Sequence, residues 1–162
     1  MYRTGHYGVS LLAYAPVGAA MLLADRPAFA LLGGAIVLGL SRVPDLDHQA
    51  PFIQHRGPTH TLAFALLVGG AAGVVGYYGA PALGLDAQLL AGFCLAMGAY
   101  GILAHLLGDV LTPAGVPLFW PLSSRTYSVY VTRADNRVAN WLLLALGVFV
   151  TVVTAVAVAR VA

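Results

Sequence analysis

The chain is a series of long apolar runs separated by short polar segments. The apolar runs cover residues 8–24, 28–40, 59–78, 87–108 and 138–159. A helix needs about 20 apolar residues to cross the hydrocarbon core of a bilayer, and four of these runs approach or exceed that length. The pattern therefore predicts one all-α domain over residues 1–162, a polytopic membrane helical bundle of about five spans.

The second apolar run is shorter than the others. Its 13 residues give only about 20 Å of helix, against a hydrocarbon core of roughly 30 Å. We therefore expect the first two helices to form a shallow hairpin. A cleaved signal peptide is the alternative for the first run, but its positive region is only Arg3. The next apolar segment follows almost at once, so we expect the first run to be retained.

Composition supports the membrane assignment. Hydrophobic residues make up 60% of the chain and charged residues 9%, whereas soluble domains contain about 25% charged residues. Lysine and glutamate do not occur, so every charge belongs to one of eight arginines or six aspartates. The net charge of +2 is small and dispersed, and we expect no nucleic-acid partner.

Polar residues are concentrated in residues 41–58, the polar segment between the second and third runs. Breaks at Pro44, Pro51, Gly57 and Pro58 exclude a continuous helix there. In a chain this apolar, so many ionisable groups in one short segment indicate a functional site. The segment contains Arg42, Asp45, Asp47, His48, His55 and Arg56.

The fourth apolar run ends with His105 and Asp109, which lie four residues apart. Four residues are about one helical turn, so both side chains leave the same face of the helix. Asp109 lies near the helix C-terminus, where carbonyl dipoles disfavour a carboxylate unless a cation is close. A divalent metal would supply that cation. The alternative is a polar pair at the boundary between membrane and water.

The order of the spans predicts which side each polar residue occupies. Because each span reverses the side, all five histidines fall on one face, together with Asp45, Asp47, Asp109 and Asp135. Six of the eight arginines fall on that face too, with Arg26 and Arg160 opposite. The positive-inside rule then makes the histidine face cytoplasmic.

Imidazole and carboxylate are ligands that suit zinc or a similar divalent ion. We expect the helix that follows His60 to hold this histidine neutral through its positive dipole end. A hydrolytic site also needs a cation near the reacting oxygens, and Arg56 and Arg125 are candidates because guanidinium pairs with phosphate. Asp47, His48 and His55 are either ligands or hydrogen-bonding support for ligands.

These residues together resemble the YdjM-like family of membrane-bound metal-dependent hydrolases. The resemblance covers most of the chain. That family is distantly similar to the zinc-dependent phospholipase C and single-strand nuclease group, whose members have three-metal phosphodiesterase centres. The motifs that carry the resemblance are His6, residues 44–48, residues 55–60, and the run His105-x-x-x-Asp109-x-x-Thr112-x-x-Gly115.

The resemblance implies that Asp45, His60, His105 and Asp109 bind one metal, with His6 and Asp109 contributing to another. No histidine follows Asp109, so the pair that completes a third metal site in the soluble enzymes is missing, and we expect one or two zinc ions.

The expected function is a cell-membrane hydrolase acting on a small-molecule or lipid phosphoester, with Arg56, Asp47 and His55 as catalytic residues. The expected partners are membrane lipids and that substrate. A non-enzymatic metal-binding membrane protein, either a transporter or a scaffold stapled by its metal, is the alternative function.

Overall fold

The computed structural model describes residues 1–49 and 55–161, and its main elements are five α-helices. Within these residues the one β interaction is an isolated antiparallel bridge between Val116 and Tyr127. The predicted all-α fold is therefore confirmed. Pro51, one of the predicted helix breakers, lies outside the described residues. The helices are α1 (Arg3–Leu23), α2 (Pro27–Leu40), α3 (Leu62–Gly79), α4 (Ala87–Val110) and α5 (Arg137–Ala159).

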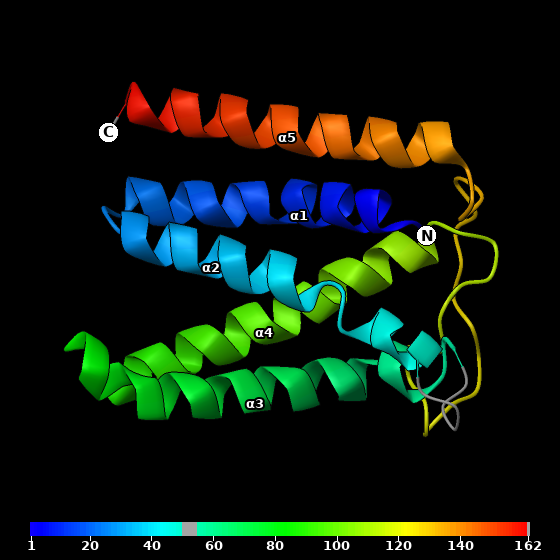
Figure 1. The fold of residues 1–162 in the computed structure, drawn as a ribbon, viewed down its shortest axis with the longest axis horizontal. Helices are drawn as coiled ribbons and strands as arrows, with labels where there is room; N and C mark the ends of the chain where they lie inside the picture. The colour runs from blue at the N-terminus through cyan, green and yellow to red at the C-terminus, as the bar shows by residue number, and fades with distance from the viewer. Residues whose placement is uncertain (50–54, 162) are drawn as a thin grey trace.

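The helices lie roughly along one direction (Figure 1). α1 lies beside α5, α3 packs along α4, and α2 contacts both α1 and α4. The N-terminus lies at the same end of the bundle as the short helices η1 (Pro44–Gln49) and η2 (Pro58–His60), and the C-terminus lies at the other end. The loop of residues 111–136 also lies at the N-terminal end (Figure 1). Segments far apart in sequence thus meet at one end, as the order of spans predicts.

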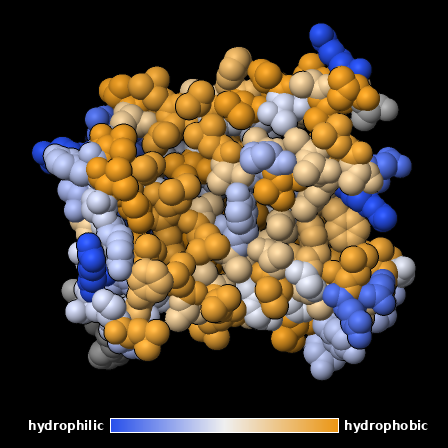
Figure 2. Space-filling model, turned by 180° about the vertical axis from the view of Figure 1, so that it is seen from behind, coloured by the Kyte–Doolittle hydropathy of each residue, from blue (hydrophilic) through white to orange (hydrophobic). Residues whose placement is uncertain are grey.

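Five segments of the described chain are long and apolar enough to span a membrane. α1 begins at Arg3, five residues before the predicted run, so His6 lies inside the helix and not ahead of it. α2 has only 14 residues, as expected, and the candidate span Pro27–Gln49 includes η1 as well. Figure 2 shows a broad hydrophobic belt on one face, with the most hydrophilic residues at its two ends.

Glycines set the distances between the paired helices. A Cβ on Gly69 would lie 2.8 Å from the carbonyl oxygen of Leu95, and one on Gly73 would lie 3.1 Å from the Leu95 Cβ. The Gly69-x-x-x-Gly73 pattern therefore faces α4, as expected for close helix packing in lipid. Between α1 and α5, a Cβ on Gly147 would lie 2.6 Å from the carbonyl oxygen of Gly8.

We predict that Gly8→Ala weakens the pairing of α1 with α5. The new Cβ would overlap the backbone of Leu143 and Leu144, and overpacking of this kind costs about 1–3 kcal/mol. Thermal unfolding in detergent should show a lower midpoint. The matched control is Gly70→Ala, which has open space around it and should leave the midpoint unchanged or raise it slightly. Equal midpoints for the two variants would contradict the packing.

Candidate metal centre

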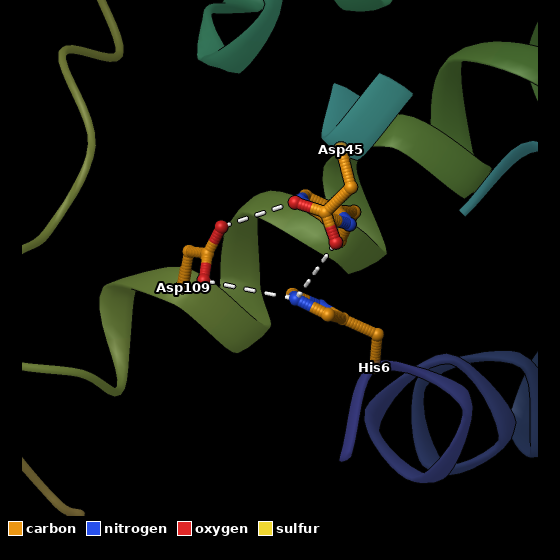
Figure 3. A group of neighbouring side chains, drawn as sticks. His6, Asp45 and Asp109 are labelled. Carbon is orange, nitrogen blue, oxygen red and sulfur yellow. Dashed lines mark ion pairs between the residues drawn. The ribbon is translucent and has the colours of Figure 1, made fainter. Parts of the chain in front are cut away.

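The five predicted metal ligands come together at the end of the bundle where η1 and η2 lie. α1 contributes His6, η1 Asp45, η2 His60, and α4 both His105 and Asp109. Figure 3 shows the side chains of His6, Asp45 and Asp109 pointing toward one another. His6, His60, His105 and Asp109 are almost completely buried, whereas the Asp45 side chain is 27% exposed.

Four side-chain atoms lie close together at the centre of the cluster. His60 Nε2 lies 3.7 Å from Asp45 Oδ1 and 3.4 Å from Asp109 Oδ2. His105 Nε2 lies 3.6 Å and 3.2 Å from the same two oxygens, and the two Nε2 atoms are 3.3 Å apart. Ligand atoms on a tetrahedral zinc ion, with bonds of about 2.1 Å, are roughly 3.4 Å apart. These five separations fit a zinc-sized ion.

Hydrogen bonds on the far side of each imidazole fix which nitrogen faces the centre of the cluster. His105 Nδ1 lies 2.6 Å from the carbonyl oxygen of Ser41, which can only accept, so this nitrogen carries the proton. His60 Nδ1 lies 3.0 Å from Thr59 Oγ1, whose own hydroxyl donates to Asp47 Oδ2 at 2.7 Å. When neutral, both rings therefore present an Nε2 lone pair inward, as metal-ligating histidines do.

The inward-facing lone pairs need a positive charge between them. Asp109 Oδ2 is buried and makes no hydrogen bond within the described chain, although both Nε2 atoms lie within 3.4 Å of it. Two bare nitrogens and a carboxylate oxygen repel one another unless a proton or a metal ion lies between them. The residues present therefore fit a metal ion.

The carboxylates around His60 oppose the helix dipole, which was expected to keep this histidine neutral. Burial lowers the pKa of the His60 imidazole, but the Asp109 and Asp45 carboxylates outweigh burial and raise it above its ordinary value. The dipole of the helix that follows is the weaker influence because it is distributed over several backbone groups, whereas the carboxylates lie next to the ring. The site therefore favours a cation, which can be a proton or a metal.

His6 forms a possible metal-binding group with Asp45, His105 and Asp109, whose ligand atoms all lie within 4.8 Å of one another. Its ring stacks on the His105 ring with centroids 3.8 Å apart and planes at 7°. His6 Nε2 is 3.7 Å from Asp109 Oδ1 and 3.9 Å from Asp45 Oδ2. The α-amino group of Met1 is 2.9 Å from the same Asp109 oxygen. The α-amino group is thus a cation already at this position, and occupation of the position by a metal stays a prediction.

Arg56 adjoins the cluster, as predicted. Its guanidinium donates to Asp109 Oδ1 at 2.9 Å, to Thr112 Oγ1 at 3.0 Å and to the carbonyl oxygen of Gly115 at 3.3 Å. Thr112 and Gly115 belong to the motif that begins at His105, but their contacts with Arg56 could not be inferred from it. Arg125 lies over the Tyr127 ring instead, 5.3 Å from its centroid, and no contact joins it to the cluster within the described residues.

Asp47 is an orienting carboxylate. Its side chain is fully buried, and it accepts hydrogen bonds from the hydroxyl of Thr59 and from the backbone N–H of Arg56. His55 Nδ1 lies 2.9 Å from Asp47 Oδ1, and His60 Nδ1 lies 3.4 Å from Asp47 Oδ2. These contacts occupy both carboxylate oxygens, so the geometry gives Asp47 the task of holding histidines. The catalytic roles predicted for Asp47 and His55 stay predictions.

The fold and site define a class: a multi-pass helical membrane protein with a histidine and aspartate cluster at one end of its bundle. The chain matches the YdjM inner membrane protein family over residues 1–162 and belongs to that family. This confirms the predicted family and a multi-pass inner-membrane location. The family description names a location and no reaction.

Two relatives carry the name inner membrane protein YdjM, one from Escherichia coli K12 and one from Shigella flexneri. Each is 33% identical over 125 residues, which covers 66% of this chain and 59% of the relative. The matched region thus spans about three fifths of each relative's length. No solved structure matches the chain at a significant level.

Proposed function

We propose that this chain is a membrane-bound, zinc-dependent hydrolase of phosphoester bonds in a small molecule or a lipid. The observation that carries the proposal is the set of four ligand atoms at metal-like separations, with one ligand, Asp45, partly exposed to its surroundings. Because four protein ligands complete a tetrahedral zinc ion, a hydrolytic role requires room for a water as a fifth ligand, which the exposed side of Asp45 can provide.

The chain's own residues supply the other parts of a hydrolytic site. A bound zinc ion would lower the pKa of a water toward about 7 and neutralise charge on the substrate. Arg56 has five N–H groups, and its described contacts use three. The remaining donors can bind phosphate oxygens, because guanidinium matches their geometry. Its position is fixed by α4 and the loop after it, so little reordering is needed on binding.

The site is proposed to face the cytoplasm. The end of the bundle that carries the cluster holds Arg3, Arg42 and Arg56, and the order of spans adds Arg125, Arg133 and Arg137. This distribution follows the positive-inside rule. The surrounding arginines would also contact anionic headgroups of membrane lipids.

Metal content and hydrolysis together test the proposal. Purified protein should contain zinc, and it should cleave bis(p-nitrophenyl) phosphate or another member of a phosphoester panel that includes phospholipids. Bound zinc without turnover on any member would favour a metal-binding scaffold or transporter. A protein that binds no zinc after supplementation would overturn both functions.

Arg56→Ala is predicted to keep the metal and lose turnover. Removing one preorganised donor to a developing oxyanion lowers kcat by about 100-fold to 1000-fold. The matched control is Arg125→Ala, whose guanidinium lies away from the cluster and which should keep the wild-type rate. Zinc content by mass spectrometry separates loss of metal from loss of turnover. Unchanged rates in Arg56→Ala would remove its proposed role.

A further inference from the structure

A second group of possible ligands lies on the outer side of Asp45. Asp45, His48 and His55 each place a ligand atom within 4.8 Å of the others. The His48 and His55 rings stack with centroids 3.6 Å apart at an interplanar angle of 30°. None of the residues assigned to the inner cluster except Asp45 belongs to this group. A stacked histidine pair alone would not indicate a metal site. Three further features support one here.

The first feature is the orientation of His55. Its Nδ1 lies 2.9 Å from Asp47 Oδ1, so neutral His55 carries its proton on Nδ1 and presents Nε2 as a lone pair. The same buried carboxylate also faces His60 Nδ1. Asp47 thus orients two imidazoles at once, His60 of the inner cluster and His55 of the outer group. Outer partners of this kind fix the tautomer of a ligating histidine.

The second feature is the sharing of Asp45. Its Oδ1 faces His60 and His105 in the inner cluster, while the residue also belongs to the outer group. Carboxylates have two oxygens with about four lone-pair positions, so one aspartate can serve two ions. Two adjacent metal ions are a recurring arrangement in enzymes that cleave phosphoesters.

The third feature is exposure. His48 is exposed and the His55 side chain is 34% exposed, unlike the buried inner histidines. Two imidazoles and one carboxylate leave at least one position of a tetrahedral ion for water or another small ligand. An ion held there would exchange more readily than one enclosed by buried ligands.

We propose that Asp45, His48 and His55 form an outer divalent-metal site, suited to zinc, that shares Asp45 with the inner centre. It is distinct from the position beside His6. The site rests on these contacts and not on the proposed hydrolysis, so the two ideas can fail separately.

Zinc titration of the metal-free full-length protein in detergent tests the outer site, with equivalents counted by calorimetry and mass spectrometry. His48→Ala should bind one ion fewer than wild type at the same free zinc concentration and keep the tightest ion. Its outer affinity should fall more than about 100-fold, beyond the 10-fold to 100-fold typical of an outer-shell partner. Gln49→Ala, an exposed neighbour in η1, should match wild type.

Zinc binding by Asp47→Asn is a second test of the outer site. Because Asp47 contacts both His55 and His60, this variant should weaken the inner and the outer ion together, each by about 10-fold to 100-fold. The outer site is overturned if His48→Ala binds as many ions as wild type with unchanged affinities, or if it loses the tightest ion.

A measurement on the wild-type protein tests the outer site without depending on how the variants fold. Zinc should protect His48 from modification by diethyl pyrocarbonate, detected by peptide mass spectrometry. Modification of His48 at the same rate with and without saturating zinc would also overturn the outer site.

Discussion

Asp109→Ala is expected to abolish binding of the inner metal ion and to destabilise the site end of the bundle more than any other single change in the cluster. Asp109 has both oxygens committed, Oδ2 facing His60 and His105 and Oδ1 facing Arg56. Removal takes away one ligand and leaves the mostly buried Arg56 without its carboxylate. Breaking a buried ion pair in this way costs about 3–5 kcal/mol.

The Asp109→Ala protein should give a poor yield, a lower thermal midpoint in detergent and loss of the tightest-bound zinc ion by mass spectrometry. The control is Asp135→Ala at the same end of the bundle, where the ion pair with Arg133 is exposed on both sides. Exposed pairs contribute little, so this variant should behave as wild type. Retention of the tightest zinc ion in a folded Asp109→Ala protein would mean that the inner centre is built from other residues.

Long-range placement was the part of the fold that the sequence predicted well. Hydrophobic runs mark membrane helices reliably because backbone groups in lipid must be satisfied within the helix. Once the runs were known, alternation of sides placed His6, Asp45, His60, His105 and Asp109 at one end. The boundaries were less accurate: α1 begins at Arg3 and α4 extends to Val110. Polar residues in a terminal turn do not reveal whether the helix includes them.

The support around the ligands could not be predicted. His105 is held by the backbone carbonyl of Ser41. Every residue has such a carbonyl, so the sequence does not show which one will contact a side chain. Arg56 is held by Thr112 and the carbonyl of Gly115, which depends on how the loop after α4 turns back. The Arg56 backbone has a φ of +60°, an uncommon conformation for a residue other than glycine. No local pattern indicates it.

The charge on His60 could not be predicted for a different reason. A helix dipole can be inferred from one segment, whereas the charge around a side chain depends on every element that meets there. Asp45 and Asp109 come from η1 and α4, and they raise the pKa of His60 where the dipole alone would have lowered it. Electrostatics at a site assembled from four elements therefore requires the structure, even when each contributing residue is known in advance.

Removal of the metal is the second change with a large expected effect. Without an ion, the lone pairs of His60 and His105 face each other at 3.3 Å beside the buried Asp109 carboxylate, so the site end should become less stable. Chelation should lower the thermal midpoint and reduce phosphoester hydrolysis at least 100-fold if a metal-activated water is needed. Returning zinc at about 100 times its Kd should restore about 2.7 kcal/mol and the lost turnover.

The variant His105→Ala separates the metal from other effects of the chelator. This variant lacks one inner ligand but keeps η1, η2 and the rest of α4, so its midpoint should already be low and should respond to chelator and zinc less than the wild-type midpoint does. A wild-type thermal midpoint that changes with neither chelator nor zinc would show that the cluster is stabilised by protons and Arg56 alone. Equal zinc responses in wild type and His105→Ala would place the stabilising ion elsewhere, because an ion bound by four convergent atoms cannot tolerate the loss of one without a change in affinity.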